Sequence, residues 1–158
     1  MAVNYGKKFE GKVLEDLKSS FPDSVTIRIP DQQSKYKGQS SNICDIVSFN
    51  EDRLFLVECK TTHDTTFNFA RLTQYDDLLA YKDKKGVYPG VVIWFVELDL
   101  IIWVNIGEIE KMKLDGKKSV SPKSLELCDY KLYKVPAKKK RTFFKCDFSF
   151  LMSITKEV

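Results

Sequence analysis

The chain of 158 residues has one histidine, His63, and its four cysteines, Cys44, Cys59, Cys128 and Cys146, form no CxxC pair. Zinc sites are built from closely spaced Cys and His ligands, so these residues make a poor zinc set. Cysteines without paired spacing are expected to be reduced thiols, buried mostly as small apolar groups, in a cytoplasmic protein.

Long apolar runs are missing as well. No stretch approaches the roughly 18 apolar residues of a membrane-spanning helix, and the segment "MAVNYGKKFEGK" lacks the pattern of a signal peptide. A glycine-rich phosphate loop, a Ser-His-Asp order and a dinucleotide fingerprint are also missing. We therefore expect no membrane partner and no small-molecule cofactor.

The composition is that of a globular protein, with 43% hydrophobic and 30% charged residues. Length and the lack of linkers or repeats predict a single domain over residues 1–158. The net charge of +4 is compatible with a nucleic-acid partner but does not require one.

Hydrophobic periodicity predicts a helix over residues 5–21, followed by a strand over 24–29 that ends at Pro30. Residues 43–49 and 54–60 read as a hairpin with its turn at 50–52. Leu72, Tyr75 and Leu79 share one face of a predicted helix, for which Gly86 is a plausible C-cap.

Residues 90–106 are the most apolar stretch and predict two strands joined near 97–100. After residue 107 the pattern is weaker. It allows a helix leading into a strand over 124–136 and a final strand or helix over 141–154. This order of elements predicts an α/β fold with a mixed central sheet flanked by helices.

The segment "RLFLVECKTT" ends an apolar strand with a carboxylate, a thiol and an amine. Side chains two apart in a strand share a face, so Glu58 and Lys60 point the same way and Cys59 points into packing on the other side. The hairpin turn brings Asp45 close to Glu58 on the neighbouring strand. Two adjacent carboxylates repel each other unless a cation lies between them, and a hard ion such as Mg²⁺ takes oxygen ligands of this kind.

Glu10 lies near the middle of the apolar stripe of the first predicted helix. A carboxylate in a core-facing position is costly unless it is paired or bound to a metal. Glu10 is therefore a candidate third acidic group of the site. The alternative is a glutamate at the edge of the stripe that reaches solvent.

Glu10, Asp45 and the run Glu58-Cys59-Lys60 resemble the PD-(D/E)XK nuclease pattern. Gln74, in the helix that follows, stands where many such nucleases carry a glutamine. The resemblance implies a restriction-endonuclease-like core in which Glu10, Asp45 and Glu58 bind Mg²⁺, with Mn²⁺ as a possible substitute. Lys60 would position or activate the attacking water, and Gln74 would orient Lys60 or a phosphate.

The chain further resembles the RecU Holliday-junction resolvases of Gram-positive bacteria and their phages. The N-terminal motif is matched by Asn4, Gly6, Phe9 and Glu10, the Gln-Ser-Ser segment by Gln39, Ser40 and Ser41, and the E-x-K-x-T run by Glu58, Lys60 and Thr62, with Phe67 beyond it. The resemblance implies a Mg²⁺-dependent endonuclease that resolves four-way DNA junctions by paired nicks in recombination and repair. Another endonuclease of this fold, of restriction or repair type, and a non-catalytic DNA-binding module are the alternatives.

Two basic segments are candidate phosphate contacts. The first lies in the loop before Asp45, and the second is the run "KKKR". The predicted DNA-binding residues are Lys35, Lys37, Ser40, Ser41, Lys138, Lys139, Lys140 and Arg141. For the second segment, a solvated turn between strands is an equal alternative.

A four-way junction has approximate two-fold symmetry, and the sequence offers one candidate active site per chain. We therefore expect a homodimer with two-fold symmetry. The apolar residues 91–104 or the Phe-rich C-terminal segment are the expected source of its interface.

Overall fold

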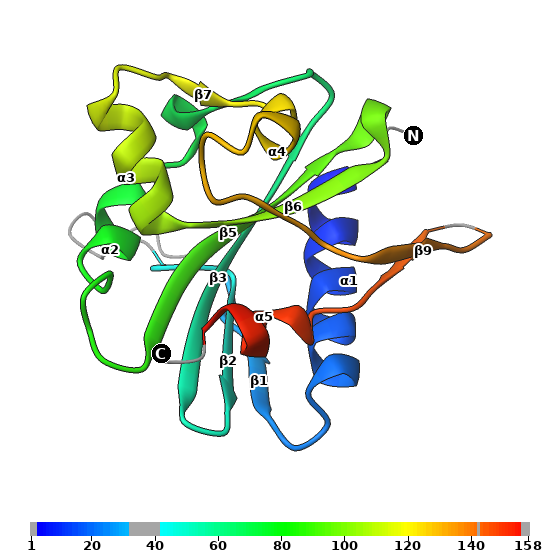
Figure 1. Cartoon of the computed structure of the whole chain (residues 1–158). Helices are drawn as coiled ribbons and strands as arrows, with labels where there is room; N and C mark the ends of the chain where they lie inside the picture. The colour runs from blue at the N-terminus through cyan, green and yellow to red at the C-terminus, as the bar shows by residue number, and fades with distance from the viewer. Residues whose placement is uncertain (1–2, 32–41, 142, 156–158) are drawn as a thin grey trace.

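The structure, a computed structural model, describes residues 3–31, 42–141 and 143–155. Its centre is a six-stranded mixed sheet in the order β1-β2-β3-β5-β6-β8, with helices against both faces (Figure 1). The strands are β1 (Val25–Arg28), β2 (Ile46–Asn50), β3 (Arg53–Thr62), β5 (Val87–Phe95), β6 (Leu100–Asn105) and β8 (Tyr133–Lys134). The pair β3–β5 is parallel and the other pairs are antiparallel. The predicted α/β fold is confirmed.

The helix α1 (Tyr5–Ser20) covers one face of the sheet. The side chain of Asn4 caps it by accepting a hydrogen bond from the Lys7 N–H at 3.1 Å. Phe9, Val13 and Leu17, four residues apart, are at most 1% exposed and pack on the sheet. The predicted helix and its apolar stripe are confirmed.

The other face carries the second half of the core. The elements on this side are α2 (Tyr75–Leu79), α3 (Ile106–Leu114) and α4 (Lys123–Leu127), with a small sheet formed by β4 (Phe67–Asn68) and β7 (Ser119–Val120). The predicted helix in this region is shorter than expected, because Leu72 lies before α2, after a 3₁₀ turn over Phe69–Arg71. Gly86 has φ of 75° in the turn before β5, and is not the C-cap of α2.

The C-terminal region returns to the α1 side of the sheet. A two-stranded hairpin, β9 (Ala137–Lys139) and β10 (Phe144–Cys146), projects beside α1, and α5 (Phe150–Ile154) follows it. Figure 1 shows this hairpin extending from the body of the protein. The sequence allowed either a strand or a helix at this end, and the structure has one of each.

The expected dimer surface was placed wrongly. The strands β5 and β6, joined by a 3₁₀ turn over Val96–Leu98, are central in the sheet, and Val91–Phe95 is at most 5% exposed. Phe144, Phe148 and Leu151 of the C-terminal segment are also buried. These large side chains are used in the core of the chain itself.

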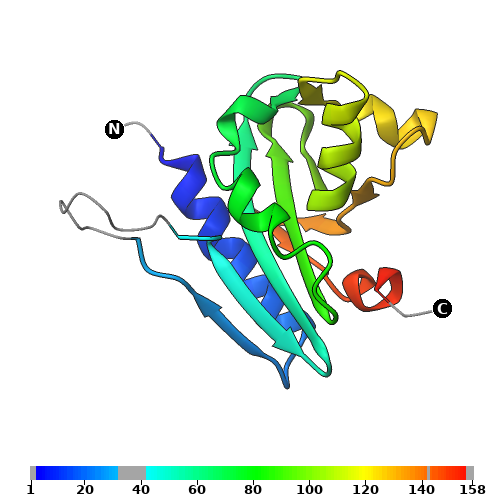
Figure 2. The same ribbon diagram turned by 90° about the vertical axis from the view of Figure 1, so that its left-hand side faces the viewer.

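Exposed apolar residues lie instead on the edge strand β1 and its neighbour β2. Val25, Ile27 and Phe49 are 63%, 55% and 46% exposed. The register pairs Val25 with Phe49, so their side chains share the face that faces away from α1. Figure 2 shows that α2 and α3 cover the upper part of this face and leave the β1–β2 end open.

No helix in the described part of the chain is long and apolar enough to cross a membrane.

Candidate active site

The end of β3 carries the predicted catalytic pair on one face of the sheet. Glu58 and Lys60 share this face, and the Lys60 Nζ lies 3.2 Å from Glu58 Oε1. Cys59 packs on the opposite face, against the α1 side of the core. The orientation predicted for all three residues is confirmed.

Asp45, the residue just before β2, lies beside this end of β3. Its backbone N–H donates to the Val57 carbonyl at 3.1 Å, and its Oδ2 accepts from the Cys59 N–H at 2.9 Å. The Asp45 carboxylate thus accepts the hydrogen bond that a backbone carbonyl would accept if the β2–β3 pairing continued. Because the N–H and C=O of a strand residue point to the same edge, the Cys59 carbonyl also faces Asp45.

Glu58 is in an unusual environment for a carboxylate. It is 2% exposed, and its Oε2 is buried without a hydrogen-bond partner in the described part of the chain. Burial, and then the charge of Asp45, raises the pKa of Glu58 to about 8, although Lys60 opposes the shift. Such a group is protonated at neutral pH unless a cation replaces its proton.

Glu10 comes to this region from α1 but is already paired. Its carboxylate accepts a hydrogen bond from Arg28 Nε, and its side chain is 13% exposed. Burial raises the pKa of Glu10, the bond to Arg28 lowers it, and the charge of Asp45 raises it again. Glu10 and Asp45 are therefore close enough to interact, and the pattern of residues did not indicate the part played by Arg28.

The fit of a metal ion rests on these oxygens. Asp45 and Glu58 offer two adjacent carboxylates, with a buried oxygen that nothing in the described chain satisfies. Within the same residues, no three His, Cys, Asp or Glu side chains form a compact metal cluster. The donor set suits a hard cation bound by two carboxylates, backbone oxygen and water, which is a common arrangement for Mg²⁺.

No hydrogen bond joins the side chain of Gln74 to Lys60 in the described part of the chain. It precedes α2, and the Thr73 Oγ1 donates to its Oε1 at 3.1 Å. Of the predicted phosphate contacts, Lys35, Lys37, Ser40 and Ser41, like Gln39 of the motif, lie outside the described residues.

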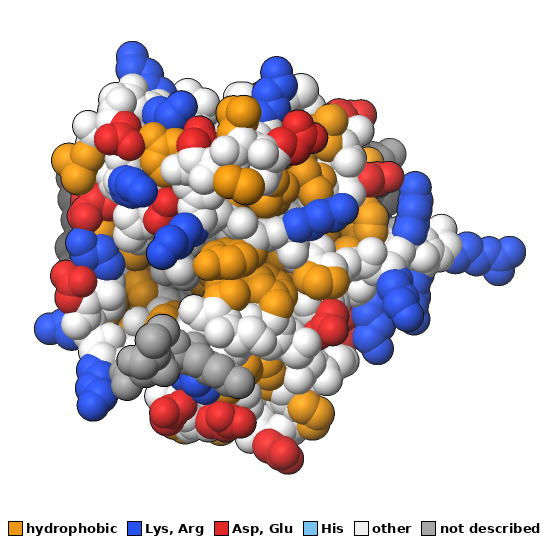
Figure 3. Space-filling view, viewed as in Figure 1, with side chains coloured by type: hydrophobic (Ala, Val, Ile, Leu, Met, Phe, Trp, Pro, Cys, Tyr) orange, Lys and Arg blue, Asp and Glu red, His pale blue; other side chains and the backbone are white. Residues whose placement is uncertain are grey.

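Lys138, Lys139, Lys140 and Arg141 are all exposed and lie on the β9–β10 hairpin and its turn. Figure 3 shows Lys and Arg side chains gathered over this hairpin. The predicted turn between two strands is therefore present, and the same exposed hairpin carries the basic residues.

No known family profile matches the sequence, and a comparison with curated proteins finds no similar sequence. Among solved structures, the chain is similar to Hjc of Archaeoglobus fulgidus, a Holliday junction resolvase from an archaeal hyperthermophile. The TM-score is 0.55 with 18% sequence identity, over 77% of this chain and 93% of the resolvase. The two chains share a fold. The restriction-endonuclease-like core predicted from the sequence is thus confirmed.

Proposed function

We propose that this protein is a divalent-metal-dependent DNA endonuclease whose substrate is branched DNA, in particular the four-way junction. The observation that carries the proposal is the orphaned, buried carboxylate oxygen of Glu58 beside Asp45 and Lys60. Besides its contact with Lys60, Glu58 keeps one buried oxygen without a partner in the described chain. An unsatisfied buried polar atom costs about 1–3 kcal/mol, so a protein that only needed stability would not keep it there. A bound cation removes that cost.

Asp45 and Glu58 would hold the ion, together with the Cys59 carbonyl that faces the same edge. Glu10 is the proposed third carboxylate, and it would have to exchange Arg28 for the ion. The cation, Mg²⁺ or Mn²⁺, supplies a Lewis acid that neutralises charge on the scissile phosphate.

Lys60 has a separate role in the proposed reaction. Its Nζ contacts Glu58 while 19% of its side chain remains exposed, so it can donate a second hydrogen bond into the site. It would orient the attacking water or a phosphate oxygen. Water adds to phosphorus and the P–O3′ bond breaks, which leaves a 5′-phosphate and, after the leaving oxygen takes a proton, a 3′-hydroxyl.

The choice of substrate is supported by two independent likenesses. The motifs built on Asn4, Gly6, Glu10 and Asp45 resemble those of the RecU resolvases, and the fold is similar to that of an archaeal Holliday junction resolvase. The RecU type is the finer proposal. The alternatives are a different nuclease of the same fold, which would cleave other DNA, and a DNA-binding module of this fold that cleaves none.

The experiment incubates the protein with a four-way junction, a linear duplex and a single strand, each with Mg²⁺, Mn²⁺ or EDTA. We expect paired nicks in the junction with either metal and none in EDTA. Cleavage of all three DNAs at similar rates would favour a general nuclease, and cleavage of none would leave a DNA-binding module. Calorimetric titration with Mn²⁺ gives a readout independent of activity: binding should be lost in Glu58→Gln.

We also propose a homodimer formed through the open face of β1 and β2. Two symmetric nicks require two active sites, and Val25, Ile27 and Phe49 form an exposed apolar patch of the kind that marks interfaces. Phe49→Asp should convert a dimer to a monomer in sedimentation, whereas Leu114→Asp, at an apolar residue that is 81% exposed elsewhere, should not. A wild-type chain that stays monomeric on junction DNA would exclude this arrangement.

A further inference from the structure

The β9–β10 hairpin and the N-terminal end of α1 enclose a second concave surface. It is a groove of about 330 Å³ that the catalytic carboxylates do not line. It is lined by aromatic rings, by four cations and by one carboxylate, that of Asp99. This combination separates it from a wider hollow that shares Lys140 with it, and that is lined by four lysines and no aromatic ring.

The aromatic part of the groove is built around Trp94. The ring centroid of Trp94 lies 5.7 Å from that of Tyr5 and 5.1 Å from that of Phe143. Trp94 is 5% exposed, while Tyr5 and Phe143 are only partly buried. The two outer rings therefore present surface on which a flat group can stack.

The cations of the groove come from the hairpin and from α1. Residues 137–146 contain five cations and no acid, so without them the chain, with its net charge of +4, would be close to neutral. Among these cations, within the described residues, only Lys139 has a carboxylate partner, Asp99, at 3.1 Å. Lys140 and Arg141 line the groove, as does Lys8 in the first turn of α1, which holds no acid to match the helix dipole.

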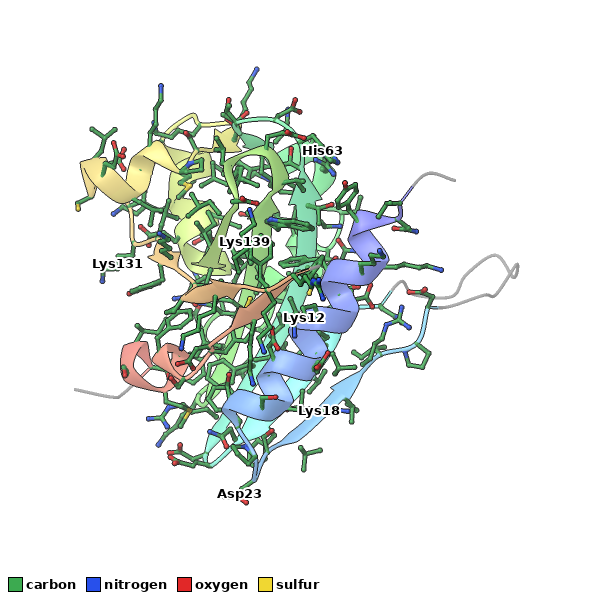
Figure 4. All side chains as sticks on the ribbon, turned by 90° about the vertical axis from the view of Figure 1, so that its right-hand side faces the viewer. Lys12, Lys18, Asp23, His63, Lys131 and Lys139 are labelled. Atoms are coloured by element: carbon green, nitrogen blue, oxygen red, sulfur yellow. The ribbon has the colours of Figure 1, made fainter. Side chains whose placement is uncertain are left out.

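The groove lies next to the candidate active site, around the end of the sheet. Trp94 is paired in register with Thr61, the residue after Lys60. Because neighbouring residues of a strand point to opposite faces, Lys60 faces the carboxylate site and Thr61 lies on the same face of the sheet as Trp94. Figure 4 shows His63, just beyond this end of β3, close to the first turn of α1, and Lys139 on the hairpin alongside that helix. A chain of nucleotides that passes the end of the sheet can reach both places.

We propose that this groove binds an unpaired DNA strand, with a base stacked on Phe143 and Tyr5 and the adjoining phosphates on Lys140, Arg141 and Lys8. Stacking on aromatic rings beside cations is the common way to bind single strands without sequence preference. A duplex has no free base face to offer, so the groove prefers unpaired nucleotides such as those that open at the centre of a branched DNA. The identity of the ligand rests on the proposed function; the geometry of the groove does not.

The test measures binding of a labelled oligothymidine of about 15 nucleotides by fluorescence anisotropy, in EDTA so that no cleavage occurs. Phe143→Leu should weaken binding about 5-fold, the lower end of the range for loss of one stacked base, since this ring is half-buried. Binding of a duplex of equal length should change less than 2-fold. Arg141→Gln should lower the slope of log K against log salt by about 0.7, the value for one phosphate contact on a single strand.

Two controls separate stacking from charge. Lys131→Gln removes an exposed cation that does not line the groove and should change the single-strand affinity less than 2-fold. An abasic oligonucleotide of the same length should bind the wild-type protein about 5-fold more weakly than oligothymidine, and this difference should disappear in Phe143→Leu. Circular dichroism confirms that each variant is folded.

The proposal is overturned if a folded Phe143→Leu binds oligothymidine like the wild type, or if the abasic strand binds the wild type equally well. It is also overturned if polyglutamate competes as effectively as the oligonucleotide, since the groove would then read negative charge alone. Failure of the nuclease function has a different signature: no DNA is cleaved with Mg²⁺, while the effects of Phe143→Leu and Arg141→Gln on binding persist.

Discussion

Replacing Glu58 with glutamine removes a negative charge from a side chain that is 2% exposed and keeps its shape. In the folded protein without metal, the pKa of Glu58 is about 8, against an ordinary value of 4.5. The folded state therefore binds this proton more tightly than the unfolded state. The carboxyl group is tolerated below about pH 4.5, and its charge destabilises the fold progressively as the pH rises through 8.

The magnitude follows from the size of the shift. The rise from 4.5 to about 8 corresponds to about 5 kcal/mol at about 1.4 kcal/mol per pH unit, as an upper limit. Part of it is already present at pH 5, and water entry and local relaxation reduce the rest. We therefore expect Glu58→Gln to raise the free energy of unfolding by about 2–4 kcal/mol more at pH 9 than at pH 5.

The assay is urea denaturation in EDTA at pH 5 and pH 9, followed by circular dichroism. Glu15→Gln, at a glutamate whose side chain is 71% exposed, is the matched control and should show no such difference. Saturating Mg²⁺ should stabilise the wild type at pH 9 and have little effect on Glu58→Gln. An equal effect of Glu58→Gln on stability at both pH values would refute the idea that an uncompensated charge is buried at this position.

The remaining predictions concern activity and packing. Asp45→Asn should abolish metal-dependent cleavage but leave DNA binding intact or tighter, because a negative group near the phosphates is lost; a variant that cleaves at the wild-type rate would contradict the site. Glu10→Gln should lower the cleavage rate with little change in the denaturation midpoint, whereas unchanged activity would make its bond to Arg28 purely structural. Gly90→Ala should cost about 1–3 kcal/mol in urea denaturation, because an added Cβ would lie 2.3 Å from the buried ring of Trp103; an unchanged midpoint would mean that this ring can move aside.

Much of the candidate site follows from local geometry that the sequence contains. The two-residue period of a strand is enough to put Glu58 and Lys60 on one face and Cys59 on the other, and a tight hairpin turn is enough to bring Asp45 alongside. The helical period likewise predicted the stripe of α1 and the inward tendency of Glu10. Each of these predictions depends on a repeat distance set by the backbone.

Other features depend on contacts between segments far apart in the chain. The alternation of Val25 and Ile27 predicts a strand, but only the position of β1 at the edge of the sheet leaves those side chains exposed. Residues 91–104 are apolar enough for either a core or an interface, and the central place of β5 and β6 decides for the core.

The sequence by itself therefore determined the α/β fold and which polar groups share a strand end, because backbone periodicity acts over a few residues. Tertiary structure alone decided the burial of Glu58 that raises its pKa, the pairing of Glu10 with Arg28, and the groove between the β9–β10 hairpin and α1. Burial and long-range pairing depend on which surfaces the whole chain brings together, and no local pattern specifies that.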